Sequence, residues 1–214
     1  MQPTPVSLPV FIRAVAAAIQ ENAEEVTALD QAVGDGDHVI NLQRGVEALI
    51  LQSGEFDKVD WAGAWQKIGM TLMTTVGGAS GSLYGTLFIA MGKAVRGRPL
   101  NLQTFAEVFA QGVEAVKQRG KADVGEKTML DVLIPVATTL QQMAATAPLQ
   151  EVLKKVRLAA ETGCESTRNM LATKGRASFL GERAKGHLDA GAKTSQLMIG
   201  AIVGVLAEDS ATPA

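Results

Sequence analysis

The spacing of apolar residues most constrains how this chain can fold, because it is helical along almost the whole length. Apolar residues recur every three or four positions, which places them on one face of an α-helix. The clearest helical segments are 11–26, 61–76, 102–116, 129–143, 152–171 and 197–206, with weaker ones at 41–51 and 82–95. No five-residue stretch alternates apolar and polar residues as a half-buried strand does. The pattern predicts an all-α protein of about eight helices.

Composition supports this fold class and excludes several functions. Of the 214 residues, 47% are hydrophobic but only 4% are aromatic, and a core of small and aliphatic side chains favours helices over a β-sandwich. A net charge of −2 argues against a nucleic-acid partner. The single cysteine, Cys164, excludes an internal disulfide. The apolar run 197–207 is about half the ~20 residues that span a bilayer, so we expect one cytoplasmic domain over 1–214 with no membrane partner.

Polar, glycine-rich loops separate the predicted helices at 30–41, 76–82, 119–128 and 174–195. In an up-and-down bundle, alternate connections lie at the same end. We therefore expect several of these loops to meet at one rim and to form a binding site there.

Three aspartates in the first loop are candidate metal ligands. Asp35 and Asp37 follow Asp30 within eight residues, and Gly34 and Gly36 allow the tight turn that would bring the carboxylates together. Carboxylate oxygens without cysteine suit a hard cation such as Mg²⁺ or Ca²⁺. The alternative is a solvated acidic turn that caps the next helix.

Three further segments could bind an anion. Small residues at 76–82 precede a helix, whose N-terminal N–H groups bind phosphate, although glycines there could equally serve close helix packing. Segment 120–128 nearly matches the P-loop pattern, but an acidic residue interrupts it and no strand precedes it, so we reject a Walker-type NTPase. It still offers N–H groups, a hydroxyl and Lys127. Segment 174–183 is too glycine-rich for a stable helix; its Arg176 could pair with a phosphate or belong to an ordinary surface loop.

Four long motifs occur in one order along the chain: GDGDH at 34–38, VGGASG at 76–81, RGKADVGEKTM at 119–129, and KGRASFLGER at 174–183 followed by GHLDAGA. In these motifs the chain resembles the nucleotide-binding L subunit of dihydroxyacetone kinase. The resemblance spans nearly the whole sequence. It implies an eight-helix antiparallel up-and-down barrel that holds ADP or ATP at one end through two Mg²⁺ ions.

The resemblance also implies roles for individual residues. The matching metal ligands are Asp30, Asp35 and Asp37, and Arg176 matches a catalytic arginine near the terminal phosphate. The matching nucleotide contacts are His38, Val39, Ile40, Asn41, Gly78, Ala79, Ser80, Leu83, Gly120, Thr128, Met129, Asp189, Ala190 and Gly191. Three positions depart from the family pattern, because Val39 replaces a common glycine, Ala190 replaces a common proline and Lys193 is an extra residue.

The function implied is phosphoryl transfer from the nucleotide to dihydroxyacetone bound on a separate K subunit. In the form that depends on the phosphoenolpyruvate phosphotransferase system, a phosphocarrier M subunit rephosphorylates the ADP. We expect His38 and His187 to be contact or structural residues rather than phosphohistidines. Two alternatives are an ATP-consuming kinase component for a related short ketose and a non-catalytic nucleotide-sensing module. The sequence leaves a homodimer open.

Overall fold

The computed structural model describes residues 4–211, and helices make up most of this part of the chain. The α-helices are α1 (Leu8–Glu21), α2 (Ala23–Val33), α3 (His38–Leu51), α4 (Trp61–Thr75), α5 (Gly78–Val95), α6 (Leu102–Gly120), α7 (Leu130–Met143), α8 (Leu149–Ser166) and α9 (Ala190–Ala211). Short 3-10 helices are η1 (Pro5–Ser7), η2 (Ser53–Lys58), η3 (Thr167–Asn169) and η4 (Arg176–Ala184). No strand occurs between residues 4 and 211, which confirms the all-α prediction.

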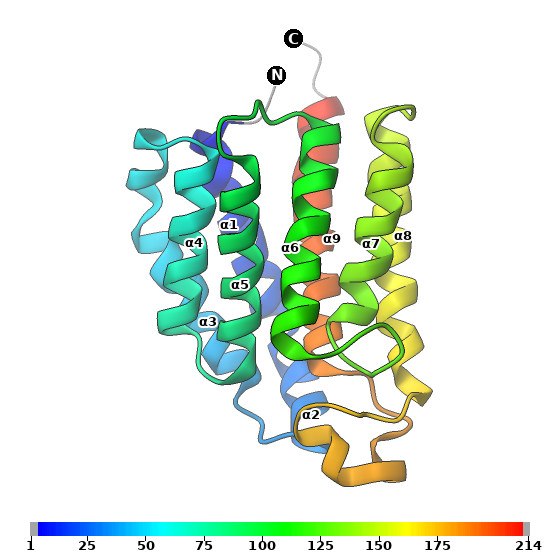
Figure 1. Ribbon diagram of the computed structural model, residues 1–214. Coiled ribbons are helices and arrows are strands. Elements are labelled where there is room, and N and C mark those ends of the chain that lie inside the picture. The colour runs from blue at the N-terminus through cyan, green and yellow to red at the C-terminus, as the bar shows by residue number, and fades with distance from the viewer. Residues whose placement is uncertain (1–3, 212–214) are drawn as a thin grey trace.

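Eight of the helices form a closed ring. Contacts join α1 to α3, continue from each helix to the next as far as α9, and return from α9 to α1. Neighbouring helices run in opposite directions around most of this ring (Figure 1). The predicted eight-helix up-and-down barrel is therefore confirmed. The additional helix, α2, lies at one end of the barrel, where it contacts α3, α9 and η4.

Several helix boundaries differ from the prediction. Helix α5 begins at Gly78 and α9 at Ala190, inside the loops predicted at 76–82 and 174–195. The segment 11–26 is not one helix, because the chain leaves helical geometry at Asn22, where φ is −107° and ψ is 13°. The Asn22 side-chain amide donates to the carbonyl of Ala18 at 2.8 Å and so ends α1. The helix predicted to reach residue 171 ends at Ser166, where η3 follows directly.

The predicted apolar stripes form the interior of the barrel. The most deeply buried side chains include Ile19, Val26, Phe56, Val108, Val132 and Val152. Short polar caps begin two of the helices: Asp60 accepts the N–H of Gly63 at 2.8 Å, and Asn101 accepts that of Thr104 at 2.8 Å. One continuous buried cluster joins α1 with α3–α9, which makes the barrel a stiff frame for its loops.

Helix α9 is the longest helix that the structure describes and is rich in apolar residues. Its window Ala190–Asp209 has a mean hydropathy of 1.3 and is, by length and composition alone, long enough to cross a membrane. A helix that packs within a bundle meets the same criteria, and α9 contacts α1, α7 and α8. The absence of a membrane partner stays a prediction.

The loops expected at one rim do lie together. The α2–α3, α4–α5 and α6–α7 connections share one end of the barrel with η3, η4 and the start of α9, at the lower end in Figure 1. The fourth predicted loop, 174–195, contains η4, whose 3-10 geometry is interrupted at Gly181. These glycine-rich segments therefore lie at one end of the barrel.

Candidate functional site

The three candidate metal ligands form a carboxylate cluster. Asp30 lies in the last turn of α2, and Asp35 and Asp37 lie in the loop that leads to α3. One oxygen from each carboxylate lies within 4.8 Å of the others; Asp30 is half-buried, while Asp35 and Asp37 are exposed. Carboxylates at ~4 Å repel by about 4 kcal/mol per pair in partly shielded surroundings, so the cluster favours a bound cation. These hard oxygen donors fit Mg²⁺.

The backbone around Gly34 brings the carboxylates together. A Cβ atom at Gly34 would lie 2.3 Å from Oδ1 of Asp30 and 2.9 Å from its main-chain oxygen, so a side chain here would displace the Asp30 carboxylate. Gly36, with φ of 78°, supplies the left-handed turn that follows. The main-chain N–H of His38 then donates to Oδ2 of Asp30 at 3.1 Å. The acidic turn therefore also caps α3, but through Asp30 rather than Asp37.

Arg176 supplies a positive charge beside this cluster. Its Nη2 atom lies 2.7 Å from Oδ2 of Asp35, and 70% of its side chain is exposed. Arg176 is the first residue of η4, which packs on α2 through a small apolar cluster of Val33, Ala172, Ala177 and Ala184. The predicted catalytic arginine and the predicted metal ligands therefore belong to one site.

His38 connects the carboxylate loop to α5 and α9. Its Nδ1 atom is 3.1 Å from Oγ of Ser80, and its Nε2 atom is 3.0 Å from Oγ1 of Thr194. Burial lowers the pKa of His38, and the nearby aspartates oppose this shift only in part. Because both ring nitrogens contact hydroxyl groups, neither is free to attack a phosphoryl group. The geometry supports the expectation that His38 is a contact or structural residue.

A buried hydroxyl network that the sequence analysis missed extends from Thr194. The hydroxyl of Tyr84 lies 3.3 Å from Oγ1 of Thr194 and 2.9 Å from Oγ of Ser195. Burial raises the pKa of Tyr84 to about 12, so the phenol stays protonated at neutral pH. No motif links these residues, because Tyr84 lies 110 positions before Thr194 and 111 before Ser195 in the chain. Together they connect the N-terminal part of α5 with that of α9.

The first turn of α5 can bind an anion. Gly78, Ala79 and Ser80 form this turn, and the residue that precedes it, Gly77, offers no side-chain cap to the N–H groups. Such N–H groups and the helix dipole favour a phosphate. Buried Asn41 lies beside this turn, since a Cβ atom at Gly77 would be 3.1 Å from its Oδ1 atom.

The side chains of two predicted contact residues in α3, Val39 and Ile40, point away from those of His38 and Asn41. The side chain of Val39 is buried in the core, and that of Ile40 is 60% exposed. Only His38 and Asn41 of this turn therefore direct side chains toward α5, and Val39 can offer a ligand only its backbone.

The α6–α7 loop supplies the remaining predicted positions. A Cβ atom at Gly120 would lie 3.4 Å from Cδ2 of Leu83, so this pair is adjacent. Buried Asp131, which the sequence analysis missed, accepts the N–H groups of Gly125 at 2.5 Å and Thr128 at 2.8 Å. The spacing Thr128-x-x-Asp131 before an apolar run is a capping-box pattern and could have identified it.

The Asp189–Gly191 turn lies against this loop. A Cβ atom at Gly191 would be 3.7 Å from Cβ of Met129, so the two predicted nucleotide segments touch. Oδ2 of Asp189 accepts the N–H of Ala192 at 2.7 Å and so caps α9. Burial raises the pKa of Asp189 to about 6.

Comparisons with known proteins agree with this geometry. Residues 32–204 match the model of the DAK2 domain. The chain belongs to the DAK2 domain family. It is 42% identical over 185 residues to the PEP-dependent dihydroxyacetone kinase 1 ADP-binding subunit DhaL of Listeria innocua, covering 86% of this chain and 88% of that protein. The corresponding subunit of Escherichia coli is 39% identical over 179 residues, covering 83% and 85%.

Longer proteins contain a similar domain. Human triokinase/FMN cyclase is 33% identical over 186 residues, which are 86% of this chain but 32% of that protein. The crystal structure of the dihydroxyacetone kinase from C. freundii in complex with AMP-PNP and Mg²⁺ superposes with a TM-score of 0.73 at 24% identity. The match covers 92% of this chain and 33% of that kinase, and it establishes the fold of the DAK2 domain.

The departures from the family pattern have local structural consequences in this DAK2 domain. The extra residue, Lys193, pairs with Glu25 at 3.0 Å and so joins α9 to α2. Ala190 is buried at the first position of α9, where a proline would also fit helical geometry. Neither change alters the carboxylate cluster.

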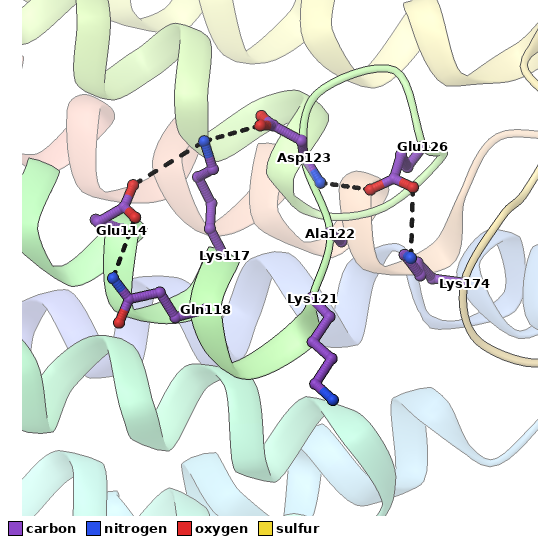
Figure 2. Close-up of a pocket in the computed structure, with 8 residues that line it drawn as sticks. All are labelled: Glu114, Lys117, Gln118, Lys121, Ala122, Asp123, Glu126 and Lys174. Carbon is purple, nitrogen blue, oxygen red and sulfur yellow. Dashed lines mark hydrogen bonds and ion pairs between the residues drawn. The ribbon is translucent and has the colours of Figure 1, made fainter.

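A shallow pocket of about 400 Å³ lies beside the site, between the end of α6 and the following loop (Figure 2). Its lining is charged and includes Lys117, paired with Asp123 at 2.9 Å, and Lys174, 3.6 Å from Glu126. None of the predicted nucleotide or metal residues lines it. The pocket is therefore separate from the predicted nucleotide positions.

Proposed function

We propose that this DAK2 domain is the nucleotide-binding phosphotransfer subunit of a dihydroxyacetone kinase. It holds ADP or ATP through magnesium ions and passes a phosphoryl group to dihydroxyacetone on a separate K subunit. The observation that carries this proposal is the cluster of Asp30, Asp35 and Asp37 beside Arg176, at the end of the barrel where α5 begins. Relatives of similar length are named as ADP-binding subunits of dihydroxyacetone kinases, which supports it.

Phosphoryl transfer requires positioning and charge neutralisation more than a protein nucleophile. The three aspartates would hold two Mg²⁺ ions, which neutralise phosphate charge when bound. The N–H groups at Gly78–Ser80 would bind phosphate oxygens. Arg176, now paired with Asp35, would stabilise charge on the transferred group. Leu83, Gly120, Thr128 and Met129 would form the base pocket, and Asp189–Gly191 would close it.

The names of the relatives favour the phosphotransferase-system form over direct use of ATP. The similar proteins of Listeria innocua and Escherichia coli are called PEP-dependent. In this form, the partners are a K subunit that binds dihydroxyacetone and a phosphocarrier M subunit that rephosphorylates bound ADP. We propose that the system is cytoplasmic and that residues 1–214 of this chain form one domain. A homodimer of this chain is a further proposal.

The first test is the nucleotide content of the purified chain. After exhaustive dialysis with Mg²⁺ and denaturation, we expect close to one ADP per chain. This result would identify ADP as a permanently held coenzyme. Little nucleotide, with reversible binding of added ATP, would instead favour the ATP-consuming kinase for a related short ketose.

The Asp35→Asn variant tests the metal assignment. It removes one carboxylate charge at nearly constant shape, so we expect loss of Mg²⁺-dependent ADP binding with unchanged helicity. Asp57→Asn is the matched control, because Asp57 is an exposed residue of η2, outside the site. Tight ADP binding by Asp35→Asn would contradict the metal site. A folded, ADP-loaded protein that forms no triose phosphate with a K subunit and phosphoryl donor would favour the nucleotide sensor.

A further inference from the structure

Lys127 occupies an unusual position beside the predicted base pocket. It directly precedes Thr128, yet its side chain is only 1% exposed. Its backbone is left-handed, with φ of 60°, a strained conformation that non-glycine residues rarely adopt. The sequence suggested an ammonium group available to an anion, but the structure directs this group inward. Other interactions in the fold must therefore offset the free-energy cost of the strained backbone and of burying the ammonium group.

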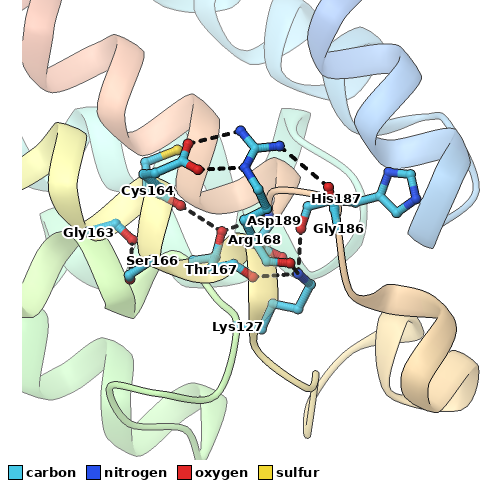
Figure 3. Close-up of polar contacts among 10 residues, drawn as sticks. Lys127, Gly163, Cys164, Ser166, Thr167, Arg168, Gly186, His187 and Asp189 are labelled. Carbon is cyan, nitrogen blue, oxygen red and sulfur yellow. Dashed lines mark hydrogen bonds and ion pairs between the residues drawn. The ribbon is translucent and has the colours of Figure 1, made fainter.

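The ammonium group of Lys127 contacts main-chain carbonyls rather than a carboxylate (Figure 3). Nζ donates to the carbonyl of Thr167 at 2.6 Å and to that of His187 at 2.5 Å, with a longer contact of 3.5 Å to Arg168. Three donors thus meet three acceptors. In the part of the chain that the structure describes, no carboxylate lies within 4.0 Å of Nζ. Two of the carbonyls follow the C-terminus of α8, where a cation is favoured.

These contacts join segments that are distant in sequence. Thr167, whose carbonyl binds Lys127, also accepts the N–H of Asp189 at 3.0 Å through its hydroxyl. His187, the other close acceptor, lies two residues before Asp189. The segment that begins at Thr128 and the turn that begins at Asp189 are thereby held against one common anchor. Their contact at Met129 and Gly191 follows from this arrangement.

The charge of Lys127 has a geometric use. An apolar side chain could fill the same space, but it could not fix the direction of three carbonyl groups. Burial lowers the pKa of Lys127, while the charge of Asp189 opposes the shift. The hydrogen bonds of the ammonium group align the two loops. Precise placement of a ligand requires rigid support of this kind.

We infer that Lys127 is a positioning residue that holds Thr128–Met129 and Asp189–Gly191 in the arrangement that binds the nucleotide. This inference rests on the proposed function only for the identity of the ligand. Lys127 itself does not touch the nucleotide in this arrangement, since its ammonium group is committed to the protein's own carbonyls.

The test compares Lys127→Met with Lys121→Met. Lys121 lies in the same loop and is also left-handed, with φ of 49°, but it is exposed, so its variant controls for strain and for loss of one charge. In nucleotide-free protein, hydrogen exchange of segments 128–131 and 189–192 is measured against α4 and α5. In ADP-loaded protein with Mg²⁺, release of a fluorescent ADP analogue is measured. Lys127→Arg, which keeps the charge, is tested for partial rescue.

We expect Lys127→Met to exchange both segments at least about tenfold faster, with α4 and α5 unchanged, and to release the analogue at least about tenfold faster. Lys121→Met should match the unmodified protein, and Lys127→Arg should release more slowly than Lys127→Met. Equal acceleration across all helices, or unchanged release, would reduce Lys127 to a stabilising residue and overturn the inference. Failure of the unmodified protein to hold ADP would contradict the proposed function, whereas the exchange pattern tests Lys127 independently.

If Lys127→Met does not fold, Thr167→Val replaces it. This variant keeps the carbonyl that Lys127 binds but removes the hydroxyl that accepts the N–H of Asp189. We then expect faster exchange at 189–192 and faster release of the analogue. Release at the unmodified rate would overturn the inference.

Discussion

Replacement of Gly163 by alanine should destabilise the barrel and disturb the candidate site together. Gly163 lies in α8, where α8 crosses α7 at the main-chain carbonyl of Asp131. Pro135, four residues later in α7, has no N–H group to bond this carbonyl. The carbonyl therefore projects toward α8, and only a residue without a side chain lets the two helices approach this closely.

The size of the effect follows from the geometry. A Cβ atom at Gly163 would lie 2.2 Å from the Asp131 oxygen and 3.1 Å from Cα of Val132, whereas ordinary contacts begin at 3.4 Å. Both neighbours are backbone, so the helices must separate by roughly 1 Å, and overpacking of this kind costs about 1–3 kcal/mol. Alanine regains about 0.5–1 kcal/mol through its higher helix propensity. We expect a net loss of roughly 1 kcal/mol, at most about 2.5 kcal/mol, and at the central value a Tm lower by about 2–4 °C.

Thermal unfolding of Gly163→Ala and Gly200→Ala provides the assay. Gly200 lies within α9, where the nearest atom to a new Cβ is Nε2 of Gln196 at 4.0 Å, so this control should be stabilised by about 0.5–1 kcal/mol. Because the Asp131 carboxylate holds Gly125 and Thr128, Gly163→Ala should also weaken ADP binding. A Tm equal to or above that of the unmodified protein would refute this account of the α7–α8 contact.

Three other predictions test separate features of the fold, the last with a control substitution. The pKa of Asp189 is about 6 when folded, against a reference value of 3.8, so its charged form opposes folding as the pH rises through this window. Asp189→Asn should therefore raise the free energy of unfolding at pH 8 by up to about 3 kcal/mol, and this gain should shrink toward zero near pH 4. Urea unfolding at the two pH values measures the gain, and a difference that does not depend on pH would contradict the prediction. Tyr84→Phe should cost about 1 kcal/mol in the same assay, by loss of the buried hydroxyl contacts, and no loss would show that the network adds nothing to stability. Phe56→Ala should lower the free energy of unfolding by about 3–5 kcal/mol, because Phe56 is fully buried. Phe179 is 88% exposed, so Phe179→Ala should change it by less than about 0.5 kcal/mol. Equal losses would argue against the described core.

Apolar spacing predicted an all-α protein of about eight helices because each wall of the barrel presents a continuous apolar face to the interior, whereas the closed barrel itself was implied by the resemblance. The sequence did not predict the break at Asn22, since apolar spacing continues from Ile19 to Val26 across it. The break depends on one side-chain contact, from Asn22 to the carbonyl of Ala18, which leaves no trace in periodicity. It also missed η4, where small alanines dock on Val33 in a cluster too small to produce a recognisable pattern.

The candidate site shows the same division between local pattern and tertiary contact. Asp35 and Asp37 join Asp30 through the local turn at Gly34, so their spacing alone indicated a cluster. Resemblance supplied the positions in distant loops, which spacing could not connect. Neither approach found the burial of Lys127, because a lysine that contacts three carbonyls has the same sequence signature as one that faces solvent.

The structure divides the site into one firmly held side and one lightly held side. His38 and the buried hydroxyl groups fix α3, α5 and α9 relative to one another through contacts inside the barrel. The η4 segment is instead held by the exposed Arg176–Asp35 pair and by a small apolar cluster, and Lys174, just before it, pairs with Glu126. Exposed ion pairs contribute at most about 1 kcal/mol each, so we expect η4 to open at a lower free energy than the barrel unfolds.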